Sequence, residues 1–320
     1  MTPDPAFPQT LVAPEGARRL DRFLAAALAD HGVSRTLVQR AIQTGAVLVN
    51  GQPATAAQSV DAGAVVTIAA LPQVEGAVLR PEAIPLDVVY EDDELVVINK
   101  PRGLVVHPAT GNPSGTLVNG LLHRYGQLED PGLASSDADL RPGIVHRLDK
   151  DTTGLMVVAR TARAGMGLRR QIAAREVKRT YLAVVRGHPA ARFTVDAAIG
   201  RTPNHLSMTV TPKGRTARTH AALRTAFPGQ PPYSLLECNL ETGRTHQIRV
   251  HLAFAGFPVA CDPLYGSQAM DRAAGLDVPG QLLHAFALAF RHPVDGRDLS
   301  FEQPVPDDFA AVVSFLSART

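Results

Sequence analysis

The chain is poor in cysteine, tryptophan and long apolar runs, and each absence excludes a class of protein. Its only two cysteines, Cys238 and Cys261, are far apart and form no CxxC pattern. This excludes a zinc ribbon and argues against a disulfide framework, so a reducing compartment is the simplest expectation. Tryptophan is absent and aromatic residues make up only 5% of the sequence. A broad aromatic platform for stacking nucleic-acid bases is therefore not expected.

Signals for membranes or export are also missing. No apolar run approaches the roughly 18 residues of a transmembrane helix. The opening segment MTPDPAFPQT has neither the basic nor the apolar region of a signal peptide. We therefore expect a cytoplasmic protein with no membrane partner.

What is present is a globular composition with an uneven charge. The 320 residues are 45% hydrophobic and 19% charged, which favours a folded chain of two domains or one large domain with an appendage. The net charge is only +2, but residues 141–186 hold eleven Lys or Arg against three Asp or Glu. This local excess of +8 indicates a polyanionic partner. A solvated helix face is the alternative interpretation.

The first part of the chain predicts a proline-rich arm and a small unit. Residues 1–16 contain four prolines and no periodicity, so we expect a disordered arm. Two helices follow, with apolar faces at 20–28 and 37–42, and Ser34 is placed to cap the second. Asn50-Gly51 predicts a hairpin, and a further strand is expected at 64–69. Residues 17–72 are too few to bury much surface, and residues 73–86, rich in Pro, predict a linker.

Residues 17–72 resemble an S4 RNA-binding domain through the segments RRLDRFLAAAL and SRTLVQRAIQTGAVLVNGQPA. The resemblance implies that the arginines of the two helices face RNA, since the apolar positions are taken by other residues. These are Arg18, Arg19, Arg22, Arg35 and Arg40. A small structural cap without RNA contacts is the alternative.

Residues 87–320 predict an α+β domain with a mainly antiparallel sheet, because strands outnumber helices and come in runs. The expected strands are 88–90, 95–99, 154–159, 181–185, 193–199, 208–211, 216–224, 233–240 and 285–290. The expected helices are 116–125, a helix capped by Thr161, 245–255 ending at Gly256, and a last helix opened by Pro306-Asp307-Asp308.

Two segments concentrate polar residues that packing alone explains poorly. In the first, Asp149 lies in a loop before an apolar strand, between Arg147 and Lys150, which favour its ionised form. A structural ion pair or a turn-capping Asp is the other interpretation. In the second, Arg249 shares a helix with Ile248 and Leu252, and an Arg rooted in an apolar face requires an anionic partner.

The remaining chemistry-bearing residues are less specific. Arg244 and Thr245 stand at the start of that helix, where they could meet a phosphate, although surface salt bridges are the alternative for both arginines. Tyr181 shares a strand face with Ala183 and is on spacing alone more typical of a core tyrosine. GxGxxG, GxxxxGK[ST] and HExxH patterns are absent, so we expect no nucleotide cofactor and no metal.

Together these segments resemble the RluA family of pseudouridine synthases. HRLDKDTTGLMVVA resembles the family's catalytic-aspartate motif, KRTYLAVVRG its tyrosine motif, and ETGRTHQIRVHLAFAGFPVACDPLYG its arginine motif. LHAFALAFRHP resembles a late strand motif, and INKPRGLVVHPATGNPSGTLVNGLL stands at residues 98–122. The resemblance covers residues 87–320 with the motifs in order.

The resemblance implies that the protein converts uridine to pseudouridine in RNA, without cofactor or metal. The glycosidic C1′–N1 bond breaks, the base turns, and C1′ joins C5, after the uridine has left the stack. Asp149 is the implied catalytic carboxylate, acting at C1′ or at C6. Arg249 is expected to form a bidentate pair with it, and Tyr181 to stack on the base and handle the C5 proton. The implied substrate-binding residues are Arg147, which fills the space left by the base, Arg244, Thr245, His246 and Gln247.

Because an S4-like unit precedes the catalytic motifs, the chain resembles the branch of the family that modifies large-subunit ribosomal RNA. We therefore expect ribosomal RNA as the partner and a monomeric enzyme. Three other functions stay open on the sequence: a transfer-RNA synthase of the same family, a non-catalytic RNA-binding assembly factor, and a metal hydrolase built on the eleven histidines.

Overall fold

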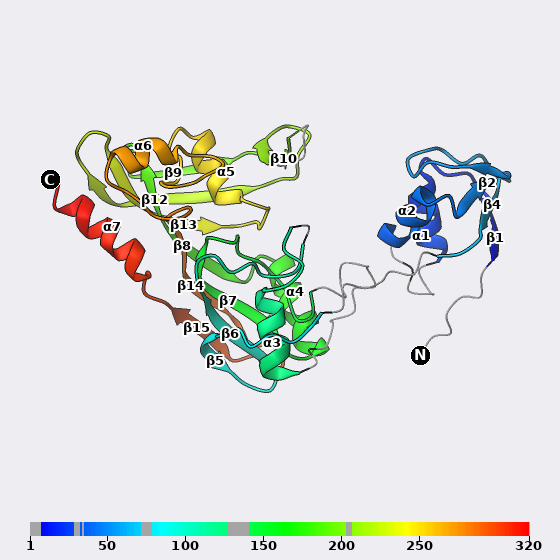
Figure 1. The fold of residues 1–320 in the computed structure, drawn as a ribbon, viewed down its shortest axis with the longest axis horizontal. Coiled ribbons are helices and arrows are strands. Elements are labelled where there is room, and N and C mark those ends of the chain that lie inside the picture. The colour runs from blue at the N-terminus through cyan, green and yellow to red at the C-terminus, as the bar shows by residue number, and fades with distance from the viewer. Residues whose placement is uncertain are drawn as a thin grey trace. The chain divides into compact units, whose positions relative to one another are not determined.

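The computed structural model describes residues 8–28, 33, 35–71, 79–109, 111–126, 128, 141–202 and 207–319. The chain divides into two compact units, one built around residues 8–71 and the other around residues 81–126 and 143–319 (Figure 1). Within the described residues no helix is long and apolar enough to cross a membrane.

The N-terminal unit packs two helices on a four-stranded sheet of order β1-β4-β2-β3. Its elements are β1 (Gln9–Val12), α1 (Leu20–Ala27), α2 (Arg35–Gln43), β2 (Val47–Val49), β3 (Gln52–Pro53) and β4 (Val65–Ile68). The expected hairpin is confirmed, since β2 pairs with β3 across Asn50 and Gly51, whose φ angles are 50° and 77°. Leu20, Leu24 and Val38 lie in the core of the unit. Ser34, the expected cap of α2, lies outside the described residues.

One expectation for this unit is wrong. Residues 9–12, placed in a disordered arm, form β1 and pair antiparallel with β4. Proline marks the residues on either side of this strand, at Pro8 and Pro14, but none lies inside it. The strand's own backbone groups are therefore free to satisfy the edge of β4, and Leu11 packs against the core.

The second unit is built on a nine-stranded sheet. Its order is β5-β6-β7-β14-β8-β13-β12-β9, with β15 pairing β14. The strands are β5 (Asp87–Glu91), β6 (Leu95–Lys100), β7 (Thr153–Ala159), β8 (Lys178–Arg186), β9 (Arg192–Asp196), β12 (Arg218–Phe227), β13 (Tyr233–Leu240), β14 (Leu283–Arg291) and β15 (Asp298–Glu302). Only the β7–β14 pair is parallel. The mainly antiparallel α+β fold is therefore confirmed.

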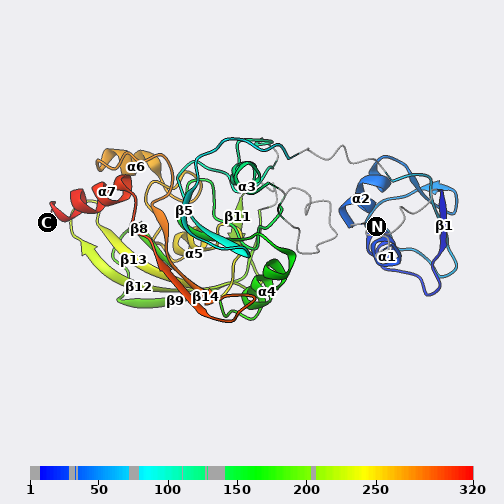
Figure 2. The same cartoon turned by 90° about the horizontal axis from the view of Figure 1, so that it is seen from below.

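Helices cover this sheet where apolar faces predict them. They are α3 (Leu117–Tyr125), α4 (Ala162–Ala173), α5 (Gln247–Phe254), α6 (Gln268–Ala273) and α7 (Asp307–Ser317). Thr161 caps α4 by accepting the Ala164 N–H, as expected. Figure 2 shows α6 and α7 near one end of this unit, where Phe309 of α7 packs in one core cluster with Val184 of β8 and Tyr233 of β13.

Three local expectations differ from the structure. The predicted strand 193–199 is two strands, because β10 (Ile199–Arg201) leaves the main sheet and pairs with β11 (Met208–Val210). Helix α5 begins at Gln247 rather than at Thr245, because His246 has the left-handed φ of 56°. Helix α6 and strand β15 were not expected, since each is too short for a clear periodicity.

At the centre of the sheet, β14 lies between β7 and β8, so the loop before β7 lies near β8. Gly154 of β7 pairs in parallel with Ala285 of β14, and Ala285 pairs on its other side with Tyr181 of β8. A Cβ at Gly154 would lie 2.3 Å from the Ala285 carbonyl oxygen, and its φ is 103°. Glycine is therefore required for this close approach.

Candidate active site

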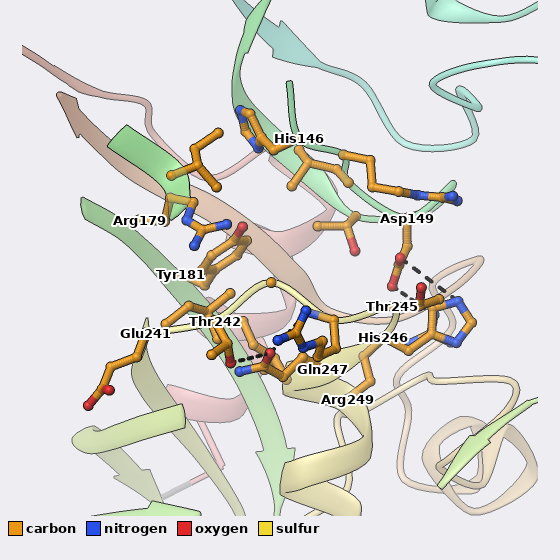
Figure 3. Close-up of a pocket in the computed structure, with 18 of the residues that line it drawn as sticks. His146, Asp149, Arg179, Tyr181, Glu241, Thr242, Thr245, His246, Gln247 and Arg249 are labelled. Atoms are coloured by element: carbon orange, nitrogen blue, oxygen red, sulfur yellow. Dashed lines mark hydrogen bonds and ion pairs between the residues drawn. The ribbon is translucent and has the colours of Figure 1, made fainter. Parts of the chain in front are cut away.

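An open cavity of about 500 Å³ lies over the centre of this sheet (Figure 3). Most of its lining comes from three parts of the chain: the loop that leads into β7, the start of β8, and the segment that joins β13 to α5. The end of α4, Arg215 and Leu283 of β14 complete it. Its lining includes all eight residues expected to act on the substrate. They are Arg147, Asp149, Tyr181, Arg244, Thr245, His246, Gln247 and Arg249. Folding thus brings together side chains that lie up to a hundred residues apart.

Asp149 and Arg249 form an ion pair at the floor of this cavity. Arg249 Nη1 donates to Asp149 Oδ2 at 3.0 Å, and the two side chains are 4% and 16% exposed. The Asp149 carbonyl oxygen accepts the Thr152 N–H, which closes the turn ahead of β7. The Asp149 carboxylate thus lines the cavity from a short, hydrogen-bonded loop that leads into β7, an inner strand of the sheet.

The bidentate partner of Arg249 is Asp262, not Asp149 as the resemblance led us to expect. Arg249 Nε and Nη2 donate to the two oxygens of Asp262 at 2.7 and 2.8 Å. This edge of the guanidinium faces the turn after α5, so only Nη1 is left for Asp149. Burial opposes the charge, but both carboxylates raise the pKa of Arg249 above its ordinary value.

Asp262 is the residue of this centre that the sequence reasoning missed. It is fully buried and also accepts the backbone N–H groups of Leu264 and Tyr265. Four donors therefore fix this buried carboxylate in place. The signal was its position thirteen residues after Arg249, inside the segment quoted for the arginine motif.

Tyr181 lines the cavity wall from β8. Its side chain is buried, and burial raises the pKa of its hydroxyl. In the sheet it stands between Ala285 and Cys238. Both neighbours are small, which leaves room for a flat ring at this position.

His246 connects Asp149 to a tyrosine. Its Nδ1 lies 2.8 Å from the Tyr265 hydroxyl, and its Nε2 lies 3.8 Å from Asp149 Oδ1. The Tyr265 hydroxyl also accepts the Met208 N–H, and its own proton is available for His246 Nδ1. With the hydroxyl as the donor, the neutral imidazole carries its proton on Nε2, toward Asp149. Burial lowers the pKa of His246, which favours this neutral form.

The other expected substrate-binding residues differ in how exposed they are and in whether they bond to the protein itself. Arg147 is exposed at the mouth, with Nη1 3.5 Å from His107 Nε2, and Thr245 is half-buried. Arg244 donates from Nε to the Thr216 carbonyl oxygen, and desolvation together with Arg215 and Arg175 lowers its pKa.

Gln247 differs from the expectation, because its hydrogen-bonding groups are used within the protein. Its Oε1 accepts from the Thr242 hydroxyl and the Arg244 N–H, and its Nε2 donates to the Arg218 carbonyl and the Thr219 hydroxyl. Gln247 thus braces the segment that carries Arg244 and His246.

Lys100 was not expected at this site. It is 1% exposed, and its Nζ donates to the carbonyl oxygens of Pro101, Leu104 and Lys150. Lys150 directly follows Asp149, so this hydrogen bond ties the loop that carries Asp149 to the end of β6. Burial lowers the pKa of Lys100 to about 7. A lysine at the end of the apolar strand LVVINK was the available signal.

The arginines expected to face RNA are in the N-terminal unit. Arg18, Arg22 and Arg40 are exposed. Arg19 is half-buried and forms a two-bond ion pair with Asp21, which also accepts from Gln39. The side chain of Arg35 lies outside the described part of the structure. Among the described residues no group of His, Cys, Asp or Glu is arranged to hold a metal ion.

A paired carboxylate and guanidinium over an antiparallel sheet, beside a buried tyrosine, is the arrangement expected from the resemblance to the pseudouridine synthase class. Comparison with known proteins agrees. Residues 94–254 match the family model "RNA pseudouridylate synthase", and residues 18–66 match the S4 domain. The chain belongs to the RNA pseudouridylate synthase family and is an enzyme of that class.

Several relatives extend over nearly the whole chain. An "Uncharacterized RNA pseudouridine synthase YlyB" from Bacillus subtilis is 43% identical and covers 94% of both chains. A "Ribosomal large subunit pseudouridine synthase D" from Nitrosomonas europaea is 45% identical, covering 92% of this chain and 83% of its own. Among solved structures, "Human RNA Pseudouridylate Synthase Domain Containing 1" matches with a TM-score of 0.55 and 25% identity, over 74% of this chain and 96% of its own.

Proposed function

We propose that this enzyme isomerises uridines of large-subunit ribosomal RNA to pseudouridine, with Asp149 as its catalytic carboxylate. The observation that carries the proposal is the Asp149–Arg249 pair, which faces a cavity of about 500 Å³. The substrate class is supported by relatives named for the large ribosomal subunit, at 41–45% identity over most of the chain.

The ion pair explains how one carboxylate stays ready to react. Arg249 is held by Asp262, so its Nη1 offers a fixed positive partner that orients the Asp149 carboxylate by binding one of its oxygens. The other oxygen faces His246 Nε2 at 3.8 Å. Asp149 then acts on the flipped uridine while the C1′–N1 bond breaks, and the freed base turns so that C5 meets C1′.

Tyr181 and the surface residues complete the proposed site. Tyr181 stacks on the flipped uracil and takes part in removal of the C5 proton. Arg147, exposed at the mouth, occupies the place that the uridine leaves in the RNA. Arg244, Thr245 and His246 line the approach to Asp149 and bind the nucleotide.

We propose a division of labour along the chain. Residues 17–72 form the RNA-binding unit, residues 73–86 a linker, and residues 87–320 the catalytic domain. The S4 match over residues 18–66 supports the first assignment, and the exposed Arg18, Arg22 and Arg40 supply its charge. No catalytic group comes from this unit.

The test is carbodiimide-based mapping of pseudouridine in all RNA of a strain that lacks the gene. Sites in large-subunit ribosomal RNA should vanish, and they should return with the wild-type gene but not with Asp149→Asn. Loss confined to transfer RNA would replace the substrate class. An unchanged map in every RNA, together with no turnover in vitro, would overturn the activity.

A further inference from the structure

Arg179 is a buried cation in the cavity wall that the proposed chemistry does not use. It stands two residues before Tyr181 on β8 and is 8% exposed. Its Nε is buried without a hydrogen-bond partner, and no acceptor among the described residues bonds to its guanidinium. In Figure 3 this guanidinium lies beside the Tyr181 ring, on the wall opposite Asp149.

Among the described residues that line the cavity, no carboxylate is left over to pair with Arg179. The acidic residues of the cavity lining are Asp149 and Glu241. Asp149 is paired with Arg249, and Glu241 is shared by Arg175, Arg218 and His220. The lining carries further cations, namely Arg175, Arg215 and Arg244. The protein therefore concentrates positive charge here and leaves one guanidinium uncompensated.

Gly243 gives this guanidinium its space. A Cβ at residue 243 would lie 3.0 Å from Arg179 Nη1. The loop between β13 and α5 thus passes close to Arg179, and a side chain at residue 243 would press on the guanidinium. Glycine at residue 243 therefore leaves the Arg179 guanidinium uncovered on the side of this loop.

We infer that Arg179 binds a phosphodiester of the RNA next to the flipped nucleotide, an inference that rests on the proposed function. A buried guanidinium is costly unless an anion meets it. Its planar fork matches two phosphate oxygens, whereas a neutral uracil carbonyl would leave the charge unbalanced. Bound in this way, the phosphate fixes the nucleotide on the Tyr181 side of the cavity while Asp149 acts from the other.

The first experiment measures RNA binding by the full chain at several salt concentrations, with an unmodified transcript of large-subunit ribosomal RNA. Arg179→Met should weaken binding about 10- to 100-fold, as expected for loss of charge-assisted hydrogen bonds. The slope of log K against log salt should fall by about 0.7–0.9, the value for one phosphate contact. Gly243→Ala should give part of the same loss without a change of charge.

The control is Arg291→Met, which also removes one positive charge. Arg291 is 75% exposed and lies outside the cavity lining, so its affinity loss should be small. Thermal unfolding separates folding from binding. Because Arg179 has no partner, Arg179→Met should unfold at the wild-type temperature or above it. A folded Arg179→Met with wild-type affinity and slope overturns the inference.

The second experiment needs no RNA and keeps the two proposals distinguishable. Inorganic phosphate should raise the unfolding temperature of the wild type above that in chloride of equal ionic strength, and Arg179→Met should lose this rise. If the wild type neither binds nor converts the transcript, the proposed RNA substrate is wrong. The phosphate measurement then decides by itself whether Arg179 forms an anion site. Equal stabilisation of both proteins by phosphate then overturns the site.

Discussion

At the scale of single residues, the active centre depends on how Arg249 divides its guanidinium. Two of its nitrogens hold the fully buried Asp262, and one is left for Asp149. The pair with Asp262 is a structural anchor, since Asp262 also binds two backbone N–H groups. The contact with Asp149 can therefore change during the reaction without releasing the arginine.

Asp149→Asn should abolish turnover while the fold and RNA binding survive. The amide keeps the shape of the side chain but loses its charge and its nucleophilic oxygen, and Arg249 keeps Asp262 as a counter-charge. Loss of a catalytic nucleophile costs about 10⁴-fold or more in rate. Tritium release from RNA labelled at uridine C5 measures the loss.

Asp151→Asn is the matched control for this substitution, because Asp151 follows in the same loop but does not line the cavity. Its turnover should stay near that of the wild type. Residual activity of Asp149→Asn above about 1% would remove Asp149 from the catalytic role, given the size expected for a nucleophile.

Arg249→Lys should lower both rate and stability. Lysine keeps the charge but cannot serve two carboxylates with three directed N–H groups. We expect the activation barrier to rise by about 2–4 kcal/mol, the range for a buried charge pair with one side impaired. Single-turnover kinetics well below the unfolding temperature would measure it.

Arg186→Lys provides the comparison for Arg249→Lys. Arg186 donates to the fully buried Asp271 at 2.6 Å, outside the cavity lining. Its replacement should reduce stability without a change in rate. Equal rate losses in both variants would show that Arg249 acts only through folding.

At the scale of secondary-structure elements, the two segments that carry the site are fixed by buried polar contacts. Lys100, at the end of β6, binds the Lys150 carbonyl of the loop before β7. Gln247, at the start of α5, binds the Arg244 N–H of the loop after β13. Each loop is thus tied to a regular element by a side chain that makes several hydrogen bonds.

Lys100→Met should change how stability depends on pH. Burial lowers the pKa of Lys100 from 10.5 to about 7 in the folded protein. Between these values the unfolded chain binds more protons than the folded one, so this lysine makes the protein more stable as the pH rises. From pH 7 to pH 9 the gain is about 2 kcal/mol.

Urea unfolding of the wild type and Lys100→Met at pH 7 and pH 9 tests this dependence. The difference between the two proteins removes the contribution of other titrating groups. Lys150→Met, which changes an exposed side chain but keeps its carbonyl, is the control. If the free energy of unfolding changes by the same amount from pH 7 to pH 9 in the wild type and in Lys100→Met, Lys100 keeps its proton in the folded protein throughout this range.

Elements with a strong local signal were predictable from the sequence. The Asn50-Gly51 hairpin, the Thr161 cap of α4 and the end of α5 before Gly256 all follow from residues within one turn. The start of α5 was not predictable, because Tyr265 holds His246 in a left-handed conformation. The split of 193–199 into β9 and β10 likewise depends on a distant partner, β11.

The site was predictable in its members but not in their pairing. Motif resemblance placed Asp149, Tyr181 and Arg249 together, and the cavity contains all three. Asp262, Lys100 and Arg179 were missed because their significance lies in burial. A buried carboxylate, ammonium or guanidinium looks like any other charged residue until the fold shows what surrounds it.

At the scale of the whole molecule, the chain combines a pseudouridine synthase unit with a smaller S4 unit. The net charge of +2 hides an uneven distribution, because residues 141–186 hold eleven Lys or Arg against three Asp or Glu. In the N-terminal unit the structure reduces the expected set of arginines. Arg19 is committed to Asp21, which leaves Arg18, Arg22 and Arg40 as described, exposed candidates.

Replacing Arg18, Arg22 and Arg40 together by Gln in the full chain should weaken binding to a large ribosomal RNA fragment and leave the chemical step unchanged. Each lost phosphate contact should flatten the slope of log K against log salt by about 0.7–0.9, so three contacts give roughly two to three units. Turnover of a short stem-loop should be much less affected, because the proposed catalytic residues all come from the other unit.

Arg19→Gln is the internal comparison, since a guanidinium already bonded to Asp21 is less available to bind a phosphate. Its slope should stay near the wild-type value, although loss of the pair leaves the buried Asp21 with fewer donors and should lower stability. If the triple variant binds the large fragment with wild-type affinity and slope, the N-terminal unit is a structural cap and does not hold the RNA.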